Sequence, residues 1–171
     1  GKTAGSIENL GYFAAKNGWN LVVEDMHLLT QKIKKEQSNI PIFLFGHSMG
    51  SLLSRDYISQ YAQDLQGVIL SATAGDPRLL GKLGVFIAKI QSLIKGKKNF
   101  SNLLDKLSFG EFNKPFEPSR TAFDWLSRDE NEVDKYVNDP YCGTIFTSGF
   151  FVDLLSGILK INQMECIQKI P

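Results

Sequence analysis

Cysteine, histidine and long apolar runs are all scarce in this chain of 171 residues. The two cysteines, Cys142 and Cys166, are not spaced as a CxxC pair, which excludes a disulfide framework and a cysteine-based zinc site. With two histidines in the sequence, we expect no metal site, and no motif indicates a cofactor. A reducing, cytoplasmic setting is therefore the expectation.

The sequence also has no apolar segment long enough to span a membrane and no large excess of charge of either sign. No apolar run approaches the roughly 20 residues that a spanning helix needs, and the polar residues after Gly1 are unlike a signal peptide. Lys and Arg number 19 against 18 Asp and Glu, so a net charge of +1 excludes nucleic acid binding by bulk charge. Because the chain begins at Gly1 rather than Met and ends where a helix runs into Pro171, we expect more of the fold beyond both ends.

Two short apolar runs and two amphipathic segments predict a parallel βαβ unit. Apolar residues at helical spacing predict a helix over 18–36, with Asn17 as its cap, and a second helix over 50–62. The runs 40–45 and 67–71 are continuous and apolar, which is typical of strands buried on both faces. This order of strand, helix and strand predicts parallel strands with a right-handed crossover.

The charge composition and the apolar pattern of the chain change after residue 78. Region 78–114 is rich in Lys, region 115–140 is rich in Asp and Glu, and helical patterns without a convincing strand continue to about residue 160. We therefore expect a partial α/β core over 1–78, a helical cap over 79–160, and a helix over 161–171 that returns to the core. Since a two-stranded sheet is too small to be stable alone, we also expect self-association or a complementing chain.

The segment Gly46-His47-Ser48-Met49-Gly50 carries the chemistry that the sequence suggests. It is a G-x-S-x-G between a strand and a helix, which is the setting of a nucleophile elbow. Ser48 would be the nucleophile on a strained turn, and Gly46 and Gly50 would remove side chains that collide with the neighbouring strand and helix. The N–H of Met49 would supply half of an oxyanion hole. The alternative is a tight turn in which Ser48 is merely small.

Residues 43–50 resemble the elbow of α/β-hydrolases of the monoacylglycerol lipase and lysophospholipase branch, also called serine-aminopeptidase-like. Residues 1–3 look like the end of a Gly-His-Gly turn of that branch, 67–72 like its next strand, and 79–160 like its helical cap. The resemblance implies an α/β protein with a partial α/β-hydrolase fold, in which a parallel βαβ core carries the elbow. It also implies a serine hydrolase of carboxylic esters that forms an acyl-enzyme on Ser48. Its substrate would be a lipid-like ester such as a monoacylglycerol or a lysophospholipid.

The same resemblance implies a triad acid and a histidine after the elbow, on loops that would lie beyond Pro171. His27 precedes Ser48 within an amphipathic helix, so we expect a surface or boundary position for it. His47 adjoins Ser48, so we expect it to pack rather than to act as a base. Two alternatives stay open: a non-catalytic fragment that lacks the triad acid and base, and an aminopeptidase-like hydrolase of small peptides. This chain alone is expected to hydrolyse esters poorly.

Several features have a structural interpretation beside a functional one. The acidic group 129–134 lacks the spacing of a calcium loop, which favours a solvated helical face. Cys142 has no distant histidine to activate it. The basic run 82–98 is favoured as a cap helix over the mouth of the active site, and peripheral contact with an anionic membrane is compatible with that position. The apolar residues of 146–155 are expected to form mainly cap core, with an acyl pocket as the alternative.

Overall fold

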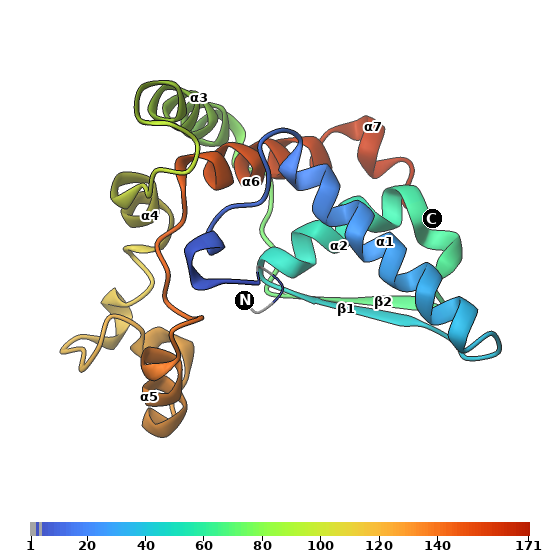
Figure 1. Ribbon diagram of the computed structural model, residues 1–171, viewed down its shortest axis with the longest axis horizontal. Helices are drawn as coiled ribbons and strands as arrows, with labels where there is room; N and C mark the ends of the chain where they lie inside the picture. The colour runs from blue at the N-terminus through green and yellow to red at the C-terminus, as the bar shows by residue number, and fades with distance from the viewer. Residues whose placement is uncertain (1–2, 4) are drawn as a thin grey trace.

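The computed structural model describes Thr3 and residues 5–171. Gly1 and Lys2, which belong to the segment that resembles the end of a Gly-His-Gly turn, lie outside the described residues. The first part of the chain forms α1 (Gly18–Glu36), β1 (Phe43–His47), α2 (Met49–Tyr61) and β2 (Gly67–Ser71). The second part forms α3 (Arg78–Lys95), α4 (Asn102–Phe109), α5 (Glu130–Asn138), α6 (Ser148–Ile161) and α7 (Met164–Ile167). Residues 79–160, all of them described, contain helices and loops and no strand, as predicted (Figure 1).

The two strands form a parallel sheet, as the sequence predicts. Phe43 pairs with Gly67 at one end of the register, and His47 pairs with Ser71 at the other. β2 occupies its predicted range, whereas β1 begins three residues later than predicted and continues to the elbow. Pro41 precedes the ladder because it has no N–H to donate to a neighbouring strand.

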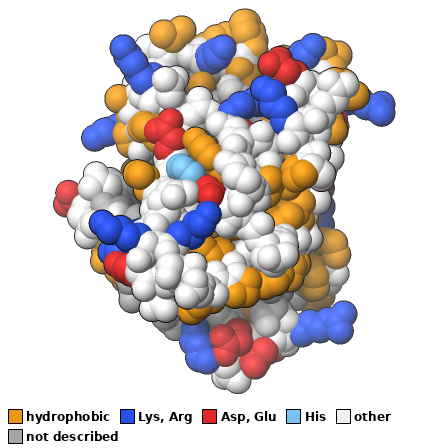
Figure 2. All heavy atoms as spheres, turned by 90° about the vertical axis from the view of Figure 1, so that its right-hand side faces the viewer, with side chains coloured by type: hydrophobic (Ala, Val, Ile, Leu, Met, Phe, Trp, Pro, Cys, Tyr) orange, Lys and Arg blue, Asp and Glu red, His pale blue; other side chains and the backbone are white. Residues whose placement is uncertain are grey.

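One face of this sheet is covered and the other is open in the described residues, so the prediction of burial on both faces is wrong for this chain. The helices α1 and α2 lie on one side only (Figure 1), where Leu44 and Val68 pack against the core. On the other side Phe43, Phe45 and Ile69 are 62%, 64% and 57% exposed. Figure 2 shows hydrophobic side chains gathered at the height of the strands, below the mixed charges of the helices.

The hydrophobic core lies between α1, α2 and α6. Trp19 and Val23 of α1, Tyr57 of α2, and Phe150 and Phe151 of α6 are all buried in one cluster. The two phenylalanines are buried, but they lie in the core with α1 and α2 rather than in the separate cap core that the sequence predicts, because α6 packs against both helices. Because α6 also packs along α3 (Figure 1), this one helix joins the second part of the chain to the part that holds the sheet.

Asn17 does not cap α1 as predicted. Its backbone is left-handed, with φ 55°, and its side chain makes no capping hydrogen bond. The carboxylate of Asp153 on α6 instead accepts hydrogen bonds from the backbone N–H groups of Gly18 and Trp19. Burial raises the pKa of the Asp153 carboxyl, and these two bonds oppose that shift. A contact that is distant in sequence therefore supplies the cap that the local side chain does not.

Candidate active site

Ser48 lies on the turn between β1 and α2, and its backbone is strained. Its φ of 51° and ψ of −120° fall in a region that residues other than glycine rarely adopt. Holding a serine there costs about 1–3 kcal/mol. The turn leaves the side chain exposed, and the N–H of Ser48 donates to the carbonyl of Ser71 at 3.0 Å. The strained strand-to-helix turn that the motif predicts is present.

Of the two glycines that flank this serine, one has a clear packing reason. A Cβ on Gly46 would collide with the hydroxyl of Ser54 and with the carbonyl of Gly50, both on α2. A Cβ on Gly50 would meet no atom within 4 Å in the described part of the chain. The prediction that both glycines avoid collisions is therefore right for Gly46 and wrong for Gly50, whose surroundings here are open.

The end of β2 supports the elbow from the side. The carbonyl of Ser71 accepts the N–H of Ser48, and the hydroxyl of Ser71 lies 3.0 Å from Nδ1 of His47. The side chain of His47 is exposed, so the packing position expected for it is wrong in this chain. The next residue, Ala72, also has a positive φ of 51°. Sequence reasoning missed Ser71, although parallel strands bring their carboxyl ends together at one edge of a sheet.

The start of α2 faces the same turn. Met49 is the first residue of the helix, so its N–H has no partner within the helix. The carbonyl of Ser48 accepts hydrogen bonds from the N–H of Ser51 at 2.9 Å and from its hydroxyl at 2.6 Å. The helix dipole places partial positive charge at this end. The arrangement suits an oxyanion role for Met49, which stays a prediction.

His27 lies far from Ser48. Its ring stacks on that of Tyr61 with centroids 3.8 Å apart, and its Nδ1 is 3.3 Å from a carboxylate oxygen of Asp64. Tyr61 is the last residue of α2, whereas Ser48 precedes the first, and a helix of 13 residues is about 20 Å long. His27 is half-buried, as expected of a boundary residue, and lies too far away to accept the Ser48 proton.

The acidic group 129–134 has structural partners. The carboxylate of Asp129 accepts the N–H of Asn131 and caps α5, and Asp134 pairs with Arg120 at 2.6 Å. In the described residues, no group of three His, Cys, Asp or Glu could hold a metal ion. Burial raises the pKa of the Cys142 thiol, which lowers its reactivity as a nucleophile.

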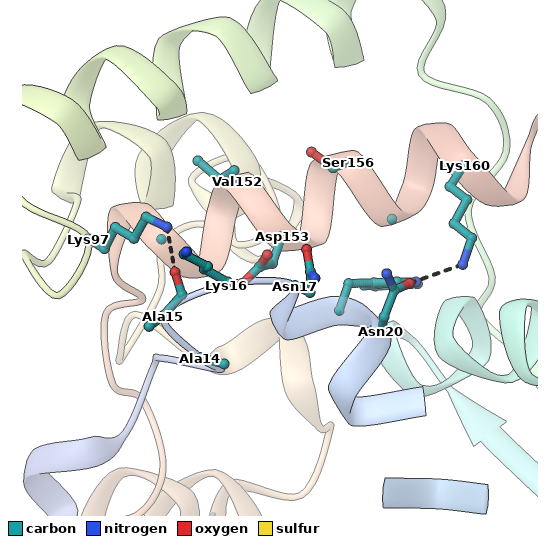
Figure 3. Close-up of a pocket in the computed structure, with 13 residues that line it drawn as sticks. Ala14, Ala15, Lys16, Asn17, Asn20, Lys97, Val152, Asp153, Ser156 and Lys160 are labelled. Carbon is teal, nitrogen blue, oxygen red and sulfur yellow. Dashed lines mark hydrogen bonds between the residues drawn. The ribbon is translucent and has the colours of Figure 1, made fainter. Parts of the chain in front are cut away.

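A pocket of about 390 Å³ lies away from the elbow, between the start of α1, the segment before it, and α6 (Figure 3). Lys16, Lys97 and Lys160 line it together with Asp153. The ammonium of Lys97 donates to the carbonyl of Ala15 at 2.5 Å. Because none of the described residues that line the pocket belongs to the elbow, this cavity is separate from the site at Ser48.

One known family and several known proteins match this chain over most of its length. The family described as serine aminopeptidase, S33, matches residues 3–170. Monoglyceride lipase of Homo sapiens is 26% identical over 156 residues, and that of Mus musculus is 24% identical over 148 residues. Both matches cover 85% of this chain, but 46% of the human and 43% of the mouse protein. The chain thus spans about half the length of these relatives.

Two solved structures have a similar fold. A highly thermostable carboxyl esterase from Bacillus coagulans, in complex with glycerol, gives a TM-score of 0.85 at 25% identity, over 100% of this chain and 55% of the esterase. A monoacylglycerol lipase from Paleococcus ferrophilus gives 0.52 at 23% identity, over 81% of this chain and 48% of the lipase. The fold is therefore a partial α/β-hydrolase fold, and the chain belongs to the serine aminopeptidase S33 family.

Proposed function

We propose that this protein is a serine hydrolase of carboxylic esters that forms an acyl-enzyme on Ser48. The exposed, positive-φ turn of Ser48 at the end of β1 is the observation that supports this function. The Ser48 hydroxyl attacks the ester carbonyl carbon, the bond to the alcohol breaks, and the alcohol leaves with a proton. Water then cleaves the acyl–serine ester and releases the acid. The N–H of Met49 donates to the oxyanion formed in each step.

We propose a lipid-like ester, such as a monoacylglycerol or a lysophospholipid, as the substrate. Relatives named monoglyceride lipase and a similar structure titled carboxyl esterase support this class. The family description favours a second candidate, hydrolysis of small peptides, by the same serine chemistry. Parallel assays with a monoacylglycerol and an aminoacyl p-nitroanilide distinguish the two.

We propose that the triad acid and histidine come from a further polypeptide segment or from a second copy, which also covers the open sheet face. His27 is a helix length from Ser48, and His47 adjoins Ser48 on the turn with its Nδ1 against Ser71. The exposed side chains of Phe43 and Phe45 offer the apolar surface that such a segment would bury. Because a serine without a base is a weak nucleophile, this chain alone would be a poor esterase.

A fluorophosphonate probe should label Ser48, and should do so faster in a longer polypeptide that supplies the acid and the histidine. Since loss of triad members costs about 10⁴-fold or more in rate, we expect labelling of this chain alone to be at least about 10³-fold slower. Mass spectrometry of the labelled peptide identifies the residue, and turnover of p-nitrophenyl butyrate measures the reaction with an ester.

The controls are two serine variants of the same turn and helix. Ser48→Ala should abolish labelling, and Ser59→Ala on α2 should leave the labelling rate unchanged. Label on a different residue, or an unchanged rate in Ser48→Ala, would contradict the proposal. Burst kinetics with p-nitrophenyl butyrate in this chain alone would show that no further segment is needed.

The helix α3 packs through small residues and exposes large ones. Gly81, Gly84 and Ala88 face α6, and a Cβ on Gly84 would lie 3.0 Å from a methyl group of Leu155. Large apolar side chains are exposed along the rest of the helix: Leu79, Leu80, Leu83, Phe86, Ile90, Leu93 and Ile94. The helix carries no acidic residue and four basic ones: Arg78, Lys82, Lys89 and Lys95. Within the described part of the chain, no helix is long and apolar enough to cross a membrane.

We propose that α3, as part of a cap over 79–160, lies on an anionic membrane surface. The double variant Lys82→Glu/Lys89→Glu should weaken binding to phosphatidylglycerol vesicles about tenfold or more, because each basic residue near such a surface contributes about 1 kcal/mol. Phe86→Ser should also weaken it, through lost apolar burial. Cosedimentation with vesicles measures both effects.

The matched control for the vesicle experiment is Lys114→Glu/Lys135→Glu, which reverses two charges outside α3. Its binding should equal that of the unsubstituted chain. If the α3 variant also binds as before, or if pure phosphatidylcholine vesicles bind equally well, the membrane proposal is wrong.

A further inference from the structure

Arg55 on α2 contacts both connections between the sheet part of the chain and region 79–160. The chain leaves β2 through residues 72–77 and returns at Asn162, directly after α6. Nη1 of Arg55 donates to the carbonyl of Ala74, in the outgoing connection, at 2.9 Å. Nη2 donates to Oδ1 of Asn162 at 2.9 Å and to the carbonyl of Ile161 at 3.4 Å, in the returning connection.

The orientation of Asn162 is itself fixed. Its Nδ2 donates to the carbonyl of Ile158 in the last turn of α6 at 2.8 Å, which directs Oδ1 toward Arg55. The guanidinium also lies at the carboxyl end of α6, where the helix dipole favours a cation. The returning connection is therefore held by hydrogen bonds and by charge together.

Arg55 lies on the helix that begins directly after the candidate nucleophile. Ser48 precedes α2, and Arg55 stands at i+7 from it, which is nearly two turns and about 10 Å along the axis. The adjacent Asp56 pairs with Lys160 at 2.8 Å, but this bond reaches only the returning side. The helix that begins at the elbow thus carries the one side chain, among the described residues, that donates hydrogen bonds to both Ala74 and Asn162.

We propose that Arg55 is a positioning residue that sets the cap against Ser48 and so shapes the acyl part of the site. This inference rests on the proposed function. A planar guanidinium with five N–H donors can bond two segments in fixed directions, which a lysine ammonium does not reproduce. Without Arg55 the two connections lose the hydrogen bonds that hold them to α2. The cap is then no longer held in one position against a long acyl chain that lies between it and the elbow. A short acyl group, which needs only the elbow, is much less affected.

Amide exchange in three variants of this chain tests the anchoring step. Arg55→Met removes the anchor, Arg55→Lys keeps only its charge, and Arg120→Met is the matched control because its partner Asp134 lies within region 79–160. In Arg55→Met, the amide of Arg78, which donates to Asp76 of the outgoing connection, and the amides of 158–163 should exchange at least about tenfold faster, as expected when charge-assisted hydrogen bonds are lost. Arg55→Lys should fall between, and Arg120→Met should leave these two segments unchanged. Unchanged exchange there in Arg55→Met would overturn the inference.

Acylation rates in the longer polypeptide separate positioning from a general loss of stability. Arg55→Met should slow labelling by a long-chain fluorophosphonate about tenfold and labelling by a short-chain one less than about twofold. Equal losses with both probes would overturn the positioning role. Absence of Ser48 labelling in the unsubstituted protein would instead contradict the proposed function, and the exchange measurement would still decide whether Arg55 holds the two connections.

Discussion

A loss of about 3 kcal/mol in the free energy of unfolding is expected for Asp56→Ala, because the variant removes a buried carboxylate and the hydrogen bonds that it accepts. Asp56 is 0% exposed. Its Oδ2 accepts hydrogen bonds from Nε1 of Trp19 at 2.6 Å and from the Lys160 ammonium at 2.8 Å. Its Oδ1 accepts one from Gln60 at 2.8 Å. Truncation leaves the buried indole N–H unpaired and removes the point at which α1, α2 and α6 meet.

Urea unfolding with the matched variant Asp134→Ala measures this effect. Asp134 also forms a close ion pair, with Arg120 at 2.6 Å, but both side chains are about half exposed, so water screens the charges. We therefore expect a clear shift of the urea midpoint for Asp56→Ala and a small one for Asp134→Ala. Equal midpoint shifts for the two variants would show that the buried network does not hold the helices together.

Gly157→Ala should destabilise the protein although alanine favours helices. Within α6, helix propensity alone would stabilise the variant by about 1 kcal/mol. A Cβ at Gly157, however, would lie only 2.1–2.4 Å from three atoms of the Trp19 ring. That ring has little freedom to move, because its Nε1 is bonded to the buried Asp56. Overpacking costs about 1–3 kcal/mol, and the close overlap places this variant at the upper end, so we expect a net loss of about 2 kcal/mol.

Two comparisons isolate the steric cause. Gly75→Ala adds the same methyl group where no described atom lies within 4 Å, so its unfolding midpoint should hardly change. In a Trp19→Ala background, where the ring is absent, Gly157→Ala should become stabilising by about 1 kcal/mol, a coupling that a double-mutant cycle measures. A higher midpoint for Gly157→Ala in the otherwise unchanged chain would rule out the overlap.

Features encoded within a few neighbouring residues could be predicted from the sequence. The amphipathic period of 18–36 gave a helix with the same bounds, the run 67–71 gave β2, and the G-x-S-x-G segment gave a strained turn at Ser48. Which face of the sheet is buried could not be predicted in this way. Burial of Phe43 and Phe45 depends on what packs across the sheet, and a continuous apolar run does not specify that partner.

Local sequence patterns also could not predict interactions between residues that are distant in the sequence. The cap of α1 is supplied by Asp153 of α6, although Asn17 has the residue type that usually caps a helix locally. In the candidate site, Ser48 follows from the motif, whereas Ser71 enters it only through the register of β1 with β2. Local sequence patterns thus identified the candidate nucleophile, and tertiary structure was needed for the residues that support its turn.

The double packing of α6 limits how region 79–160 can be exchanged between relatives. Phe150 and Phe151 belong to the core beneath α1 and α2, while Leu155 and Leu159 of the same helix lie against the glycines of α3. A chimera that takes all of 79–160 from another enzyme would replace one wall of the core as well. Junctions placed after Lys95 and before Ser148 keep both helices intact, so that only α4, α5 and their loops are exchanged.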